Sequence, residues 1–238
     1  HKFKKQHGLS MHELHGEAGS ADIRDGVRVA REQVPQLVKE LGISLDELFN
    51  LDETGLWFRR LPTRTLARES RAGNKLAKDR VTTLVTVNAT GTMKPNLWVI
   101  GKSKKPRSFG RTWTPKDVNI VYKNSKKAWM TGEIFNEYCA GMNKFAEDKH
   151  RATGRKLVFT MDNASTHSNP PGAQPWAYKD LLGFEMSHTI WVFLPKNTTS
   201  HIQPLDQGII AAMKARYRSR QVQWVISEAE RDPPSPNA

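Results

Sequence analysis

Three aspartates are the residues of this sequence whose surroundings best suit chemistry. Asp52 and Asp162 each follow a short apolar run and precede turn-forming residues, whereas Asp206 lies at the start of the last predicted helix. Cutting a phosphodiester bond needs a strong nucleophile near neutral pH and a charge sink for the leaving oxygen, and two hard cations about 3.5–4 Å apart supply both. Carboxylate oxygens are the natural ligands of Mg²⁺ or Mn²⁺. Three aspartates from distant parts of the chain are therefore a sensible minimum for such a site.

Each aspartate also has a simpler structural interpretation. Asp52 could begin a turn, and Asp162 could form an Asx turn before Ser165. Asp206 could cap a helix, where a negative charge is tolerated. Taken one at a time, the structural interpretations are favoured, and only the residues that flank the three aspartates reverse this preference.

The predicted elements would bring two of these aspartates to the edge of a sheet. Apolar and β-branched runs predict strands at residues 48–51, 80–89, 94–100, 118–122, 156–161 and 189–194. Helical spacing predicts helices at residues 27–41, 44–47, 131–147, 176–182 and from Asp206 or Gln207 to about 226. This order is typical of an α/β layered domain. In such folds the strand ends commonly carry the chemistry.

Several segments lack these patterns. Residues 16–26 are rich in Gly and Ser and are expected to form a linker. Residues 169–175 are rich in Pro and are expected to form a loop, and residues 231–238, with three prolines, are expected to be disordered. Pro35 is expected near the start of the first regular helix, where its missing N–H costs little.

The charge of the chain points to a polyanionic partner. Lys and Arg number 37 against 24 Asp and Glu, which gives a formal net charge of +13 and a pI near 9.9. A surplus of this size favours nucleic acid as the partner. A ribosomal protein or a merely soluble basic protein is the alternative at this point.

Other classes of protein are excluded by what the sequence lacks. Cys139 is the single cysteine, so neither a disulfide framework nor a cysteine-rich zinc site can form, and we expect it to be a small core residue. No apolar run approaches the ~18 residues that span a bilayer, so no membrane partner is expected. There is no glycine-rich phosphate loop. The chain begins at His1 rather than Met, which suggests a fragment.

Three blocks around the aspartates resemble the catalytic blocks of the pogo/Tigger branch of the mariner-like transposases. The first is Asp52-Glu53-Thr54-Gly55 followed by Leu56-Trp57-Phe58, and the second is Met161-Asp162-Asn163-Ala164-Ser165-Thr166-His167. The third and most specific is Phe193-Leu194-Pro195-Lys196-Asn197-Thr198-Thr199-Ser200, then Gln203-Pro204-Leu205-Asp206-Gln207-Gly208. The blocks occur in the expected order, and the match covers roughly residues 44–225. Upstream, Phe3 to Ser10 and Gly16 to Asp22 resemble the tail of a centromere-protein-B-type helix-turn-helix.

The resemblance implies an RNase H-like fold, a mixed sheet flanked by helices. It implies that Asp52, Asp162 and Asp206 are catalytic and bind Mg²⁺ or Mn²⁺. The expected activity is that of a DNA endonuclease and transposase, with two-metal hydrolysis and strand transfer on DNA in the nucleus. The expected organisation is a helix-turn-helix tail and linker over residues 1–26, a catalytic domain over 27–230 and a tail over 231–238.

Two departures from the family pattern affect these expectations. The interval between Asp162 and Asp206 is wider than the family usually shows, and we interpret the Pro-rich segment at 169–175 as part of a loop insertion that could reshape the mouth of the site. Most of the DNA-reading module is also absent, so this chain should act on DNA with little sequence selectivity.

Other polar residues support the site in different ways. Asn163 could orient a carboxylate or a water, and His167 could meet a phosphate or assist proton transfer, although turn formation and a surface position are equally compatible with the sequence. Glu53 would point away from Asp52 in a strand and is expected either to support a ligand of the site or to be structural, and Gln203 is expected to be structural.

Basic and aromatic residues offer further contacts. A basic loop that could bind DNA, form a nuclear-import patch or simply be solvated contains Lys102, Lys104, Lys105, Arg107 and Arg111. The last helix offers a second candidate phosphate-binding face at Lys214, Arg216, Arg218 and Arg220. Core positions are expected for Trp57, Trp98 and Trp191.

Three functions remain in competition. The first is an active transposase-type nuclease, and the second is a domesticated, non-catalytic nuclear protein that binds DNA or assembles with itself. The third is a nuclease that hydrolyses without joining strands. The presence of all three aspartates favours the first. The oligomeric state and the target sequence are left open.

Overall fold

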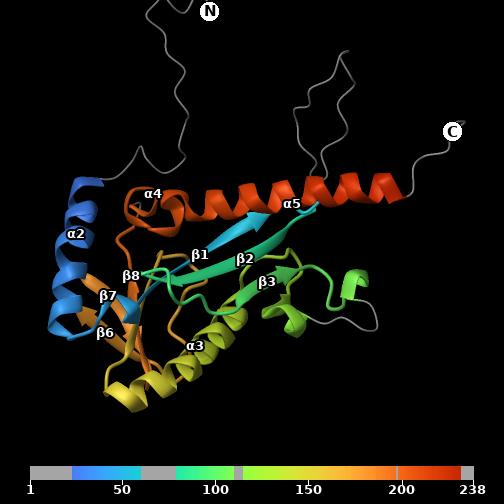
Figure 1. Ribbon diagram of the computed structural model, residues 1–238. Coiled ribbons are helices and arrows are strands. Elements are labelled where there is room, and N and C mark those ends of the chain that lie inside the picture. The colour runs from blue at the N-terminus through green and yellow to red at the C-terminus, as the bar shows by residue number, and fades with distance from the viewer. Residues whose placement is uncertain (1–22, 60–78, 110–114, 197, 232–238) are drawn as a thin grey trace, which may run out of the picture.

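An eight-stranded mixed sheet forms the centre of the computed structural model, which describes residues 23–59, 79–109, 115–196 and 198–231 (Figure 1). The strands lie in the order β4-β3-β2-β1-β5-β8-β7-β6. Their bounds are β1 Leu48–Leu56, β2 Val81–Asn88, β3 Leu97–Gly101, β4 Ile120–Asn124, β5 Leu157–Met161, β6 Gln174–Tyr178, β7 Leu181–Glu185 and β8 Thr189–Phe193. The helices are α2 Ile23–Glu40, α3 Gly132–Thr153, α4 Thr199–Ile202 and α5 Ile210–Arg231. Short turns of helix are η1 Leu45–Glu47, η2 Arg107–Phe109, η3 Pro115–Val118 and η4 Leu205–Ile209.

The strand directions bring several carboxyl ends to one edge of the sheet. β1, β2 and β3 are successively antiparallel, while β5 pairs in parallel with β1 and β8 pairs in parallel with β5. The strands β1, β3, β5 and β8 therefore all end at the same edge. We call the edge at which these four strands end the carboxyl edge. The mixed sheet with its flanking helices confirms the α/β, RNase H-like fold class.

Each face of the sheet has its own apolar core. Alternate strand residues point to opposite faces, so Phe49 and Phe159 pack with α3 on one side, whereas Val158 and Val192 pack against α2 on the other. Figure 1 shows α3 on one side of the sheet and α2, α4 and α5 on the other. Cys139 is fully buried on α3, as predicted for a core residue.

The segment predicted as a short helix forms a hairpin instead, while residues 169–173 before it are a loop as predicted. Residues 176–182 are divided between β6 and β7, which pair in an antiparallel register and extend the sheet beyond β8. The helix prediction was wrong because the tight turn at Lys179, with φ of +51°, reverses the chain, and Pro175 is tolerated on an edge strand. The hairpin thus widens the sheet on the side of β8 away from β5.

Helix boundaries differ from the prediction at two places. α2 begins at Ile23 and holds Pro35 in its interior, so neither the linker prediction for residues 23–26 nor the expected place of this proline holds. The last helix is broken at Gln207 and Gly208, and α5 proper begins only at Ile210. The predicted helix-turn-helix tail at residues 1–22 and the tail after Arg231 lie outside the described residues.

No helix in the described ranges is long and apolar enough to cross a membrane.

One buried side chain joins the two central strands to the segment that precedes the last helix. Asn50 Nδ2 donates to the main-chain oxygen of Thr160 at 3.0 Å and to its hydroxyl at 3.1 Å. Asn50 Oδ1 accepts a hydrogen bond from the main-chain N–H of Leu205 at 3.2 Å. The amide therefore connects β1, β5 and η4, and its groups are almost wholly shielded from water.

Replacing Asn50 with Leu should lower the free energy of unfolding by about 3 kcal/mol, because buried partners on β5 and η4 would be left without hydrogen bonds. The matched control is Asn96→Leu, at an exposed position, which should change the free energy by less than about 0.5 kcal/mol. Urea denaturation of both variants measures the difference. Equal effects at the two positions would show that the Asn50 contacts do not stabilise the fold.

Candidate active site

The candidate site lies where the two central strands part. The pairing of β1 with β5 ends at Asn50 and Thr160. Asp52 follows two residues later on β1, on the same face as Asn50, and Asp162 follows the last residue of β5. Because the two strands are parallel, both carboxylates lie toward the carboxyl edge of the sheet.

Asp206 reaches the same place because the chain before it is bound to β1. Gln203 Nε2 donates to the main-chain oxygen of Leu51 at 3.1 Å, and Leu205 N–H donates to Asn50. Gln203 is buried, and its side chain bonds the Leu51 main-chain oxygen just beyond the end of the β1–β5 pairing. In a longer sheet, a neighbouring strand would bond this oxygen instead. The structural role predicted for Gln203 is thus a specific one.

A glycine with a left-handed backbone lets the chain turn from Asp206 into α5. Gly208 has φ of +108°, a conformation that side chains strongly disfavour. Asp206 therefore belongs to the separate turn η4 rather than to the first turn of α5, and the helix-dipole argument for its position does not apply. The break leaves Asp206 beside β1 while α5 runs along the sheet (Figure 1).

Crowding of negative charge dominates the electrostatics of the site. Burial, followed by the charges of Asp206, Glu53 and Asp162 and a hydrogen bond to Asp206, raises the pKa of Asp52 to about 8. The three predicted aspartates therefore lie within one electrostatic cluster. A carboxyl with these neighbours ionises readily only when a cation balances its charge.

His167 lies on the opposite face of β1 and joins two acidic residues, Glu53 and Asp162. Its Nε2 is 2.9 Å from Glu53 Oε1, and its Nδ1 is 2.8 Å from Asp162 Oδ1 and 3.1 Å from the Asp162 main-chain oxygen. The buried ring lies against Phe135, with centroids 4.5 Å apart. Burial lowers the pKa of this imidazole, but the two carboxylates outweigh burial and raise it to about 10.

His167 is therefore an internal cation that holds Glu53 and Asp162, and its burial keeps it from meeting a phosphate in this conformation. Glu53 points away from Asp52, as the strand alternation predicted, and yet belongs to the site through this histidine. Asn163 is exposed directly after Asp162, and its role stays a prediction.

Two acidic sets could be considered as metal ligands. Glu53, Asp162 and His167 offer ligand atoms within 4.8 Å of one another, but both nitrogens of His167 are already engaged by oxygens of the other two residues. Asp52, Asp162 and Asp206 offer only carboxylate oxygens, the donors that Mg²⁺ prefers. Asp162 belongs to both sets, and its Oδ1 lies 2.8 Å from His167 Nδ1. The second set therefore suits a hard divalent ion better.

The predicted basic loop lies at the same edge of the sheet. Lys102, Lys104 and Lys105 follow β3 directly, and Arg107 begins η2, all with exposed side chains. Because β3 and β1 run in the same direction two strands apart, this loop starts roughly 10 Å to one side of the β1 end. Arg111 lies outside the described residues.

The sequence-based prediction was wrong for Trp57, and it did not identify Asn50 and Tyr217 as residues of this region. Trp98 and Trp191 are buried as predicted, but Trp57 is 36% exposed and lies at the end of β1 beside α5. The role of Asn50 was missed, although an amide inside an apolar strand two residues before an aspartate was a usable signal. Tyr217, which also lies beside Trp57, carried no such signal.

Comparison with known proteins decides the family. Residues 78–237 match the family model described as DDE superfamily endonuclease, which is more than half of the chain. The chain belongs to this DDE endonuclease family. This confirms the membership that the three sequence blocks predicted.

Relatives of this DDE endonuclease domain are similar over nearly its whole length. The chain is 32% identical to CENP-B homolog protein 2 of Schizosaccharomyces pombe over 95% of the chain and 42% of that protein. It is 27% identical to Tigger transposable element-derived protein 7 of Homo sapiens over 93% of the chain and 40% of that protein. The chain thus spans less than half the length of these relatives. Among solved structures, it resembles the catalytic domain of Mos1 mariner transposase, with a TM-score of 0.46 and 12% identity over 92% of this chain and 84% of that one.

The raised pKa of Asp52 predicts how this DDE endonuclease domain responds to pH. Between the ordinary value of 3.8 and about 8, the carboxyl ionises in the unfolded chain but stays protonated in the fold, so stability falls as pH rises through that window. Asp52→Asn should remove this loss and be more stable than the natural protein at pH 8, by on the order of 2 kcal/mol.

Thermal or urea unfolding across this pH range measures the effect. Asp148→Asn, on the exposed side of α3, is the control and should keep the natural pH profile. A natural profile in Asp52→Asn as well would mean that the carboxyl is not held in its neutral form by its neighbours.

Proposed function

We propose that this domain is the catalytic part of a transposase-type DNA endonuclease, which hydrolyses phosphodiester bonds and transfers the cut strand to new DNA. The observation that carries the proposal is the gathering of Asp52, Asp162 and Asp206 into one cluster where β1 and β5 part. Membership of the DDE endonuclease family supports it.

The three aspartates are proposed to bind Mg²⁺ or Mn²⁺. When bound, such ions supply an activated water and stabilise the leaving oxygen of the cut strand. Mos1 paired-end complexes have been solved with Mn and with Mg, which agrees with this choice of ion. The crowding of Asp206 and Asp162 around Asp52, which raises the pKa of the Asp52 carboxyl, supports the same assignment.

The remaining residues of the site position the ligands. His167 fixes the Asp162 carboxylate and balances its charge, while Glu53 fixes the ring from the other side. Asn50 and Gln203 hold the segment that carries Asp206 against β1. Asn163, exposed beside Asp162, is proposed to orient a carboxylate or a water.

DNA is the proposed substrate and the nucleus the proposed location. The net charge of +13 and the basic loop at the carboxyl edge fit a polyanion that crosses the site. One relative is named ARS-binding protein 1, and others are named CENP-B homologs; all of these are from fission yeast. In a eukaryotic cell, a protein that acts on chromosomal DNA is located in the nucleus.

A second function, a domesticated protein that binds DNA without cutting it, is favoured by one observation. Relatives named Tigger transposable element-derived protein are described as derived from transposable elements rather than as transposases. Both proposals share the DNA-binding edge, and they differ only in whether the three aspartates still act.

Plasmid nicking separates the two functions. With Mg²⁺ or Mn²⁺, the natural chain should nick supercoiled DNA, and Asp52→Asn, Asp162→Asn and Asp206→Asn should each reduce the rate at least a hundredfold. Loss of a residue that only supports a ligand already costs about 10–100-fold, so loss of the ligand itself should cost at least as much. Asp148→Asn should nick normally.

Two results would count against the catalytic proposal. Normal nicking by Asp162→Asn would remove that aspartate from the chemistry. DNA binding by the natural chain without any metal-dependent nicking would support the non-catalytic protein.

The basic loop gives a separate prediction about DNA binding. The triple variant Lys102→Gln, Lys104→Gln and Lys105→Gln should weaken binding to duplex DNA and lower the dependence of log K on log salt by up to about 0.9 for each phosphate that is no longer neutralised. Its control removes the same charge from the outer surface of α3, with Lys144→Gln, Lys149→Gln and Arg151→Gln. Fluorescence anisotropy at several salt concentrations measures both. Equal effects of the two triple variants would show that only net charge matters.

A further inference from the structure

A small groove opens between the end of β1 and the first turns of α5, beside the carboxylate cluster. Its volume is about 120 Å³, and it is lined by Gly55, Leu56, Trp57, Lys214, Tyr217 and Arg218. The charges of Asp52 and Asp206 act on Lys214, which places the groove next to the proposed catalytic centre. The groove is therefore where a DNA strand leaving that centre along α5 would pass.

Neither cation of the groove forms a close ion pair with a described residue. Lys214 and Arg218 are one helical turn apart on α5, and no carboxylate lies within ion-pairing distance of either in the ranges that the structure describes. Burial, followed by the charge of Arg218, lowers the pKa of Lys214. Two neighbouring cations that repel each other in a partly enclosed groove form a binding site for an anion such as a phosphate.

Trp57 is one of two aromatic residues that line the groove, and its side chain is partly exposed. Trp57 belongs to neither apolar core, and 36% of its surface is open to solvent. A tryptophan ring beside cations is the usual platform for an unpaired base, since every base has a face that can stack. A site for phosphate alone would not need this ring.

We propose that this groove binds one unpaired nucleotide of the DNA strand adjacent to the cleaved phosphate. Its phosphate contacts Lys214 and Arg218, and its base stacks on Trp57. That this nucleotide lies beside the cleaved phosphate rests on the proposed function. The binding itself, however, needs neither metal nor cutting.

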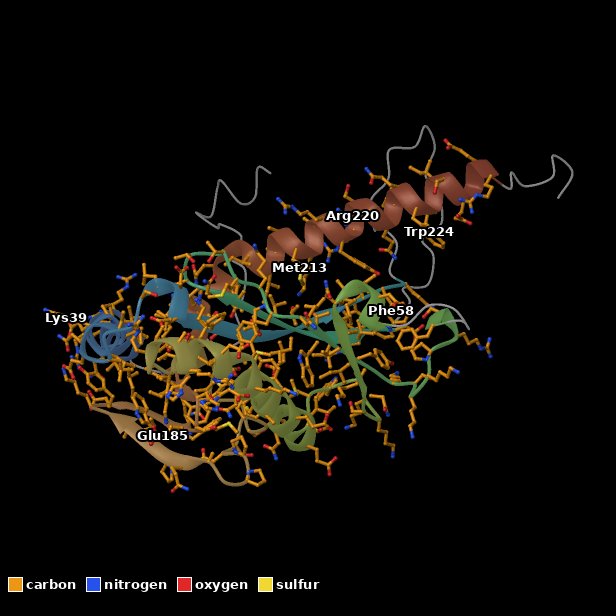
Figure 2. The ribbon with its side chains drawn as sticks, turned by 60° about the horizontal axis from the view of Figure 1, so that its bottom comes forward. Lys39, Phe58, Glu185, Met213, Arg220 and Trp224 are labelled. Atoms are coloured by element: carbon orange, nitrogen blue, oxygen red, sulfur yellow. The ribbon has the colours of Figure 1, made fainter. Side chains whose placement is uncertain are left out.

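Two exposed residues of α5 provide matched controls. Arg220 and Trp224 have the same side-chain types as Arg218 and Trp57 but lie farther along the helix, outside the groove (Figure 2). Trp224 is 63% exposed, so its removal disturbs little packing.

The test measures binding of two short single-stranded probes of equal length by the 238-residue chain in EDTA. One probe is oligothymidylate, and the other has the same phosphates and sugars without bases. The natural chain should bind oligothymidylate about tenfold more tightly, as expected for one stacked base. Trp57→Ala should lose this preference, whereas Trp57→Phe and Trp224→Ala should keep it.

Charge variants test the phosphate contact independently. Lys214→Gln and Arg218→Gln should weaken binding of both probes equally and lower the salt dependence by about 0.7 each, whereas Arg220→Gln should do so less. The proposal is overturned if the natural chain does not prefer bases, if Trp57→Ala keeps the preference, or if Lys214→Gln behaves like Arg220→Gln. The binding test contains no metal, so its results do not depend on whether the chain nicks DNA. Likewise, a failed binding test would leave the nicking results unchanged.

Discussion

Repulsion among carboxylates is the constraint on which the rest of this structure depends. Asp52, Glu53, Asp162 and Asp206 lie close enough for the last three to raise the pKa of the first. A fold tolerates such crowding only where protons, fixed cations or bound ions balance it. On one face of β1 the balance comes from His167, a buried cation held between Glu53 and Asp162. On the other face the pKa of the Asp52 carboxyl is raised, and Lys214 is a positive charge that acts on both Asp52 and Asp206. On one face the negative charge is thus balanced by a side chain of the protein, and on the other a bound cation could balance it.

The same constraint explains why polar side chains occupy the buried junction of the strands. If β1 and β5 stayed paired to their ends, Asp52 and Asp162 would be locked into a continuous sheet. Once the strands part, their main-chain groups need other partners. Asn50 and Gln203 provide these partners, and in doing so they attach the segment before Asp206 to β1. The contacts that stabilise the opening and the contacts that assemble the candidate site are therefore the same hydrogen bonds. A change that breaks these hydrogen bonds would therefore also release Asp206 from the other two aspartates.

The parts of this arrangement that depend on local sequence were predictable, and those that depend on distant packing were not. Apolar runs predicted the central strands, and the aspartates at their ends followed directly from those runs. The hairpin β6–β7 was mistaken for a helix because its turn depends on a positive φ at Lys179, where no glycine signals it. Trp57 was assigned to the core because its apolar neighbours are visible in the sequence, whereas the path of α5 that leaves it exposed is not. The roles of Asn50 and His167 depend on partners roughly a hundred residues away, which no local pattern contains.

The hairpin β6–β7 extends the sheet at a distance from the candidate site. Strands added beyond β8 extend an edge, and they leave the pairing of β1, β5 and β8 untouched. The hairpin within the interval between Asp162 and Asp206 therefore lies at the side of the sheet. α2 secures the added strands, since Gln33 Nε2 donates to Asp180 at 2.6 Å and the Tyr178 hydroxyl donates to Glu40 at 2.7 Å. What must stay constant is the short distance along the chain from Gln203 to Asp206 and from Asn50 to Asp52, because these two segments dock on each other. Spacing within each of these two segments is thus a stricter requirement than the length of chain between them.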